Sequence, residues 1–425
     1  MADLFGFPSA EIQFRAEGSV DGSNGGAASA RALAADPTVT DLLVLTHGWN
    51  NDVAGARDLF TQLARSLRGV TDDGHGLAPG RKLGILGVIW PSRQFALPTQ
   101  MRGVAAAAGS PVAPQDLLDA LDGLRAVFPD HQARLDAATA LVPHLTDEAS
   151  ARRAFVEAVR GLLIPDDGDP AEAPAALFTL PGEVVLERLA VPVPVGPRVT
   201  TGHAGVAGGL LGGILGAGLN LLNYTTFYAM KERSAVVGSA GLAPLLTGIA
   251  RPGLRLHLAG HSFGARLMSA AVKALPGGVT VASVALLQGA FSHFGFSADW
   301  DPVEPGPQVG FFRADVAEPK VTGPVLITHT ANDVAVGIAY AVASRLADQV
   351  AAIVGGPDDR YGGIGCNGAQ RTAEAVPGTL LAVGGAYPWQ PHRPHNLLAD
   401  AFVTSHTDVK GREVAYAVLS AAATT

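Results

Sequence analysis

Short apolar runs that end at glycine or polar residues recur towards both ends of the chain. They lie at 40–48, 82–90, 254–260, 281–290, 324–330 and 378–384, with an alternating stretch at 10–15. Continuous apolar runs of this length are typical of strands buried on both faces. Between them, apolar residues at helical spacing predict helices at 53–68, 263–275, 337–352 and 409–422. This alternation predicts an α/β fold with a mostly parallel sheet and helices on both faces.

The alternation breaks off between residues 91 and 223. That region has no buried strand pattern, and its apolar spacing predicts helices at 114–127, 130–142 and 148–163. The rhythm resumes with a predicted helix at 224–249. Strands on both sides of the interruption must join one sheet. We therefore expect 1–90 and 224–425 to form the core, and 91–223 to be an inserted helical cap or lid.

A glycine-rich apolar segment, 203–222, lies in a stretch without formally charged residues. Its length just reaches a bilayer span, and its glycines at 208, 212 and 216 have the spacing of close helix packing in membranes. However, glycine lowers helix propensity, and a single span would separate the two halves of the core. We expect a lid or a buried cap helix. Peripheral membrane contact is the alternative, and a true span is the least favoured.

The amino-acid composition limits which kinds of binding partner and which cellular compartment are expected. The formal net charge is -8 and no basic run occurs, which argues against a nucleic-acid partner. The single cysteine, Cys366, cannot form an internal disulfide, and the first residues lack the pattern of a secretory signal. A cytoplasmic location is expected. Cys366 follows no strand-to-helix turn, so it is expected to be a loop residue rather than a nucleophile.

The segment Gly260-His261-Ser262-Phe263-Gly264 matches G-x-S-x-G. An apolar strand runs directly into it and an Ala- and Leu-rich helix leaves it. This strand–turn–helix setting is typical of a nucleophile elbow, where the serine hydroxyl is raised at a helix N-terminus. Ser262 is therefore the predicted nucleophile. The alternative is that Ser262 only caps the helix.

An early strand at 40–46 leads into His47-Gly48-Trp49-Asn50-Asn51. In this architecture such a loop supplies one backbone N–H to the oxyanion, and the residue after the nucleophile supplies another. The predicted donors are the N–H groups of Trp49 and Phe263. Asn50 or Asn51 is expected to cap the helix that begins near 53.

The acid of a catalytic triad should follow a later strand. Asp333 does so, a few residues after the strand at 324–330, and it is the predicted acid. Asp301 and Asp315 are rivals, and Asp333 itself has the alternative role of capping the helix near 337. His329 is expected to be a core histidine at the strand end.

The base should lie between the last strand and the last helix. His406 stands immediately before the helix at 409–422 and is the predicted base. His392 and His395 are rivals within WQPHRPH, a proline-interrupted segment that we expect to be a surface loop. Neither is expected to bind a metal.

Together these residues resemble the α/β-hydrolase superfamily. The similarity is closest to a poorly characterised group of bacterial and fungal serine-hydrolase-like proteins. The motifs that carry it are His47–Asn51, Ile89–Ser92, Met230–Arg233 and His257–Arg266. The resemblance covers roughly 40–90 and 224–425, and it implies ester, thioester or amide hydrolysis without a cofactor.

These observations predict a cofactor-independent serine hydrolase that acts on a small-molecule or lipid-like carboxylic ester through an acyl-Ser262 intermediate. No zinc motif, cysteine cluster or phosphate-binding loop occurs, so no metal or cofactor is expected. An amidase or peptidase with the same triad is one alternative, and an inert binding protein of the same fold is the other. The oligomeric state is not predicted by the sequence.

Overall fold

The computed structural model describes residues 2–49, 51–92, 112–163, 171, 176–191, 193–194, 209–210, 213–347 and 356–425. The chain divides into two compact units. The first, here called the sheet unit, comprises Met1–Arg93, Lys231–Thr330 and Ile364–Thr425. The second, the helical unit, comprises Gln94–Met230 and Ala331–Gly363.

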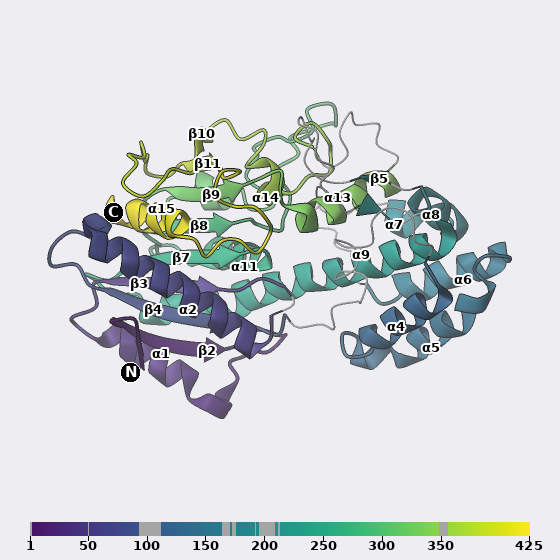
Figure 1. The fold of residues 1–425 in the computed structure, drawn as a ribbon, viewed down its shortest axis with the longest axis horizontal. Coiled ribbons are helices and arrows are strands. Elements are labelled where there is room, and N and C mark those ends of the chain that lie inside the picture. The colour runs from purple at the N-terminus through teal and green to yellow at the C-terminus, as the bar shows by residue number, and fades with distance from the viewer. Residues whose placement is uncertain are drawn as a thin grey trace. The chain divides into compact units, whose positions relative to one another are not determined.

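The sheet unit is built on nine strands (Figure 1). Every neighbouring pair is parallel except the pair that β1 makes with β2 at one edge. The predicted α/β class with a mostly parallel sheet is thus confirmed. In spatial order the strands are β1 (Ala2–Leu4), β2 (Phe7–Gln13), β4 (Leu83–Ile89), β3 (Asp41–Thr46), β7 (Arg255–His261), β8 (Ser283–Leu287), β9 (Val325–His329), β11 (Pro394–Leu398) and β10 (Val376–Thr379).

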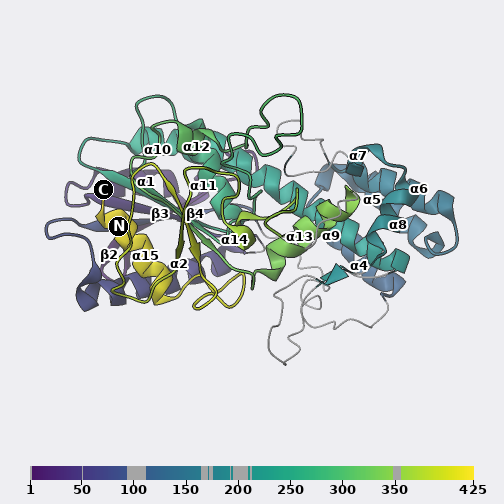
Figure 2. The same ribbon diagram turned by 90° about the horizontal axis from the view of Figure 1, so that it is seen from above.

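Helices cover both faces of this sheet (Figure 2). Alternate residues of β3 point to opposite faces, so Leu43 and Leu45 pack in the core beneath α2 (Val53–Val70) and α15 (Arg412–Ala423). The opposite face carries α1 (Gly26–Ala35), α10 (Ala243–Ile249), α11 (Phe263–Ala274) and the short α12 (Ala314–Ala317). Burial on both faces explains why the strands are continuous apolar runs.

The helical unit contains α4 (Pro114–Leu124), α5 (Gln132–Leu141), α6 (Ala149–Arg160), α7 (Ala176–Thr179), α8 (Gly182–Leu189) and α13 (Val334–Leu346), with a two-stranded pair, β5 (Val193–Pro194) and β6 (Gly209–Leu210). Helix α9 runs from Gly213 to Val236 without a break at 223, so the boundary between the units falls inside it. The helical unit also takes in 331–363, which the sequence pattern assigned to the core.

The apolar segment 203–222 is described in part. Its residues from Gly213 onward form the start of α9, where Ala217, Leu219, Leu221 and Leu222 are buried. Residues 203–208 and 211–212 lie outside the described residues. Among the helices that the structure describes, none is long and apolar enough to cross a membrane.

Two strand predictions near the C-terminus need correction. The run at 378–384 forms a strand only at its start, as part of β10, and the next strand, β11, begins inside the segment 389–395 that was expected to be a surface loop. The two prolines of WQPHRPH made this part of the sequence resemble a loop rather than a strand. Pro394 is the first residue of β11, a position where a missing N–H is tolerated.

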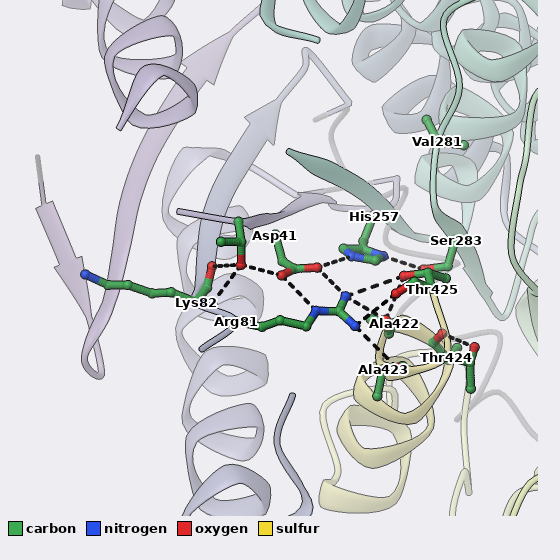
Figure 3. A network of polar contacts seen from close by, with 12 residues as sticks. Asp41, Arg81, Lys82, His257, Val281, Ser283, Ala422, Ala423, Thr424 and Thr425 are labelled. Atoms are coloured by element: carbon green, nitrogen blue, oxygen red, sulfur yellow. Dashed lines mark hydrogen bonds and ion pairs between the residues drawn. The ribbon is translucent and has the colours of Figure 1, made fainter. Parts of the chain in front are cut away.

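A buried polar network occupies the amino ends of β3, β7 and β8 (Figure 3). The Asp41 carboxylate accepts hydrogen bonds from the Arg81 guanidinium, and its Oδ1 lies 3.0 Å from His257 Nε2. His257 Nδ1 lies 2.8 Å from Ser283 Oγ. These contacts hold the pKa of Asp41 below its usual value, whereas burial lowers the pKa of His257. The network is an ionic core in which Asp41 is negative and His257 neutral.

The same guanidinium fastens the last helix to the sheet. Arg81 donates to the backbone oxygens of Ala422, Ala423 and Thr425 at 3.0–3.3 Å, which satisfies carbonyls at the end of α15 (Figure 3). The loop that precedes α15 carries His406. The network therefore fixes the C-terminal end of α15, the helix that follows the predicted base.

Replacing Asp41 by asparagine should lower the free energy of unfolding by about 3–5 kcal/mol, because the mostly buried Arg81 would lose its counter-charge. Urea unfolding at neutral pH measures this. The matched control is Asp58→Asn, whose carboxylate is exposed and 3.7 Å from Lys410, and which should cost less than about 1 kcal/mol. Equal effects of the two variants would contradict the assignment.

Acid should weaken the fold in the range where His257 titrates in the unfolded chain. The pKa of His257 is lower in the folded protein than in the unfolded chain. The free energy that His257 contributes to folding is therefore complete above pH 6.5, its ordinary pKa, and is lost as the pH falls below that value. His257→Gln should therefore be less stable than the wild type at pH 7.5, with a gap that narrows by pH 5.5. Urea unfolding at both pH values measures the gap, and a constant gap would refute this role.

Candidate active site

Ser262 lies at a sharp turn between β7 and α11. Its backbone has φ 58° and ψ -124°, a combination that non-glycine residues rarely adopt. The turn is held in place because Ser262 N–H donates to Leu287 O (3.0 Å) and Ala290 N–H donates to Ser262 O (3.1 Å). A strained serine that the surrounding backbone holds between a strand and a helix has the geometry of a nucleophile elbow.

The glycines on either side of Ser262 are required by close backbone contacts. A Cβ at Gly260 would lie 2.3 Å from Gly264 O, and a Cβ at Gly264 would lie 2.7 Å from His47 O. No side chain fits at such separations. The spacing of the G-x-S-x-G pattern therefore follows from the packing of this turn against its own helix and against the end of β3.

His406 brings an imidazole to the serine. Its Nε2 lies 2.9 Å from Ser262 Oγ, across 144 residues of sequence. The base loop is anchored from the elbow itself: His261 Nε2 donates to His406 O at 2.8 Å, and the two rings are 4.8 Å apart. Asp408 closes the loop by accepting from the N–H and hydroxyl of Thr404 (3.1 and 2.8 Å). In this position the imidazole can take the serine proton during attack on an electrophile.

The loop after β3 packs directly against the serine. A Cβ at Gly48 would lie 2.5 Å from Ser262 Cβ, so only glycine allows this approach. The next residue, Trp49, has its ring 6.3 Å from that of Phe263, the first residue of α11. Both predicted oxyanion donors thus belong to segments that meet at Ser262. Their role stays a prediction.

Asn51 does not cap α2. The N-cap is Asp52, whose Oδ1 accepts from Gly55 N–H at 2.8 Å. The Asn51 side chain instead donates back to the carbonyls of Gly48 and Trp49 (3.2 and 3.1 Å). Asn50 lies outside the described residues. Aspartate caps helices as well as asparagine does, and Asp52 directly follows the two asparagines that were predicted as caps.

Asp333 follows β9 and is buried. Its Oδ1 accepts from Val336 N–H at 3.1 Å, so it caps α13, which is the alternative role that its position suggested. Asp333 belongs to the helical unit, whereas Ser262 and His406 belong to the sheet unit. Its role as the triad acid stays a prediction.

The rival carboxylates have other surroundings. Asp315 is buried in α12, where desolvation raises its pKa well above the ordinary value, and Lys320 and Lys273 partly oppose that rise. Asp301 lies in a loop, where its carboxylate is 3.4 Å from Val303 N–H.

The rival histidines lie at the amino end of β11, whereas Ser262 follows the carboxyl end of β7. His395 belongs to β11 and is 2% exposed, so the surface loop predicted for it is wrong. Its Nε2 accepts from Gln390 N–H at 3.0 Å, and His392 Nδ1 lies 2.7 Å from Val321 O. His329 ends β9 as predicted but is only partly buried there, and desolvation lowers its pKa.

Across the described ranges, no group of three or more histidine, cysteine, aspartate or glutamate side chains could hold a metal ion. Cys366 lies in the short helix α14 (Ile364–Asn367) rather than in the predicted loop, and it is not part of a disulfide.

Compared with protein-family models, with curated proteins and with solved structures, the chain matches none of them.

Gly48→Ala should slow the reaction of Ser262 with a fluorophosphonate at least about tenfold, because the new methyl group must displace either the loop or the serine. The matched control is Gly248→Ala in α10, where an added Cβ meets nothing within 4 Å. Labelling rates measured on folded protein compare the two variants. A Gly48→Ala rate equal to that of the control would contradict the close approach.

Proposed function

We propose that the protein is a cofactor-independent serine hydrolase that cleaves carboxylic esters, with Ser262 as nucleophile and His406 as general base. The proposal rests on one observation above all: His406 Nε2 lies 2.9 Å from the hydroxyl of a serine held at a strained turn. Such a pair supplies both the nucleophile and the proton acceptor that acyl transfer requires.

The arrangement of the strands supports an α/β-hydrolase fold within this proposal. Ser262, Asp333 and His406 follow β7, β9 and β11, in the chain order Ser, Asp, His that this fold uses. These strands are parallel, and they occur in the order β7, β8, β9, β11 across the sheet. Sites in sheets of this kind lie at the carboxyl ends of the strands.

The reaction then proceeds in two halves. Ser262 Oγ attacks the ester carbonyl while His406 Nε2 takes its proton, and the resulting oxyanion accepts hydrogen bonds from the N–H groups of Phe263 and Trp49. Collapse of this intermediate breaks the ester C–O bond, and His406 returns the proton to the departing alkoxide. Water next attacks the acyl-Ser262 with His406 as base, which releases the acid. Asp333 orients the imidazole in this scheme.

The substrate class is the less constrained part of the proposal. The apolar segment 203–222 favours an ester of modest size or one with an apolar acyl chain, and peripheral membrane contact through the same segment would suit a lipid-like substrate. Deleting 203–222 and comparing short-chain with long-chain esters tests this, since an unchanged preference would remove the support.

Labelling with a fluorophosphonate should modify the wild type and fail with Ser262→Ala. The chain supplies a matched control, because Ser283 Oγ also lies 2.8 Å from a histidine, His257, yet is buried at the opposite end of its strands. Ser283→Ala should label like the wild type. If folded wild type does not label, the inert binding protein is favoured. A panel of matched esters and amides separates an esterase from an amidase.

Asp333→Asn is a direct test of the predicted acid, because asparagine still caps α13 but carries no charge. If Asp333 orients His406, kcat should fall by about 10⁴. Asp301→Asn, in an exposed loop, is the control and should leave kcat unchanged. A full rate in Asp333→Asn would reduce Asp333 to a helix cap and leave Ser262 and His406 as a dyad.

A further inference from the structure

The imidazole of His47 is fully buried behind the loop that touches Ser262. Trp90 makes two hydrogen bonds with His47: its backbone N–H donates to the ring nitrogen Nε2 at 3.2 Å, and its indole Nε1 donates to the His47 backbone oxygen at 3.0 Å. The two rings are stacked, with centroids 5.8 Å apart and planes inclined by 13°. The ring therefore has one fixed orientation.

These contacts also determine which ring nitrogen carries the proton. A backbone N–H can only donate, so His47 Nε2 must be unprotonated. Burial lowers the pKa of His47 to about 4, so the ring is neutral near neutral pH and its single proton is on Nδ1. His47 Nδ1 lies 3.0 Å from Gly48 O, to which it donates, and 3.3 Å from Ser92 Oγ, which lies farther away and donates its own proton to Asn51 O.

The Gly48 carbonyl is thus held by two donors, because Asn51 Nδ2 also donates to it at 3.2 Å. In a trans peptide the C=O and the following N–H point in opposite directions, so fixing the Gly48 carbonyl fixes the direction of the Trp49 N–H. Within the described part of the chain, that N–H donates to no protein acceptor. It belongs to the peptide whose Gly48 Cα packs against Ser262.

We propose that His47, as the Nδ1–H tautomer, is a positioning residue that turns the Gly48–Trp49 peptide so that the Trp49 N–H serves as an oxyanion donor. This inference rests on the proposed function and adds to it a residue that does not itself touch the substrate. A donor preorganised in this way lowers the barrier because it needs no reorientation when negative charge develops.

Hydrogen bonds tie this clamp to the other motif segments. Ser92 Oγ donates to Asn51 O at 3.0 Å. Arg233 Nη1 donates to Pro91 O at 2.9 Å, and Arg266 Nε lies 3.3 Å from Lys231 O. The loop after β4, the C-terminal end of α9 and the elbow helix α11 thereby form one connected support around His47. A supported loop of this kind is what precise placement of one amide requires.

Two substitutions separate the donor function of His47 from its packing. An asparagine amide can reach the position of Nδ1 and donate to Gly48 O, whereas a glutamine oxygen can reach the position of Nε2 and accept from Trp90 N–H. His47→Gln should lower kcat about 10²-fold with little change in KM and no change in the pH dependence of kcat. His47→Asn should recover most of that loss.

A spectroscopic readout follows the amide itself. The chain has four tryptophans, so ¹⁵N-tryptophan labelling gives few backbone signals, and Trp49→Phe identifies the one that belongs to Trp49. Phosphonylation of Ser262 releases fluoride and places the polar phosphoryl oxygen of the neutral adduct in the oxyanion position. The Trp49 amide should then shift strongly downfield in the wild type and in His47→Asn, and much less in His47→Gln.

Different outcomes refute different claims. A wild type phosphonylated on Ser262 without a shift of the Trp49 amide would overturn the inference and leave the hydrolase proposal intact. Equal rate losses in His47→Asn and His47→Gln, with equal falls in Tm, would make His47 a packing residue only. A wild type that is not phosphonylated on Ser262 would refute the proposed function, and with it the role of His47.

Discussion

The positive φ of Ser262 is the constraint on which the candidate site depends. A non-glycine residue in such a conformation costs about 1–3 kcal/mol, so neighbouring structure must hold it there. Ser262 donates to Leu287 O at the end of β8 and accepts from Ala290 N–H, and the backbones of Gly48, Gly260 and Gly264 pack closely around the turn. The same turn presents the hydroxyl to His406 and begins α11 at Phe263. The predicted nucleophile and one predicted oxyanion donor are therefore placed by a single backbone feature.

A comparison of Ser262–His406 with Ser283–His257 shows that a hydrogen bond to histidine is not by itself enough to make a serine a nucleophile. Ser283, His257 and Asp41 form a chain of contacts at 2.8 and 3.0 Å. However, the negative charge of Asp41 is balanced by the positive charge of Arg81, and Ser283 begins its strand with no strained turn. In that setting the polar chain stabilises the fold. At Ser262 the strained turn, the helix N-terminus and the glycine loop supply what the other pair lacks.

Features set by local sequence were predictable. The buried strands, the elbow and the position of His406 follow from apolar runs, glycines and chain order, because each depends on a few neighbouring residues. β11 was missed because its prolines disguise a strand that tertiary pairing stabilises, and the contact of His47 with Trp90 spans 43 residues of sequence. The Ser–His distance and the His47 tautomer likewise come from long-range packing that one-dimensional patterns do not encode.

The most direct test of the account is a search for the acyl-enzyme itself. The protein would be mixed with an activated ester such as p-nitrophenyl acetate, quenched in acid within the first turnover and analysed by intact mass and peptide mapping. The account predicts a burst of nitrophenol, a mass increase of one acetyl group and its location on Ser262, all absent in His406→Ala on the same timescale. Steady hydrolysis without an adduct, or an adduct elsewhere in the chain, would contradict it.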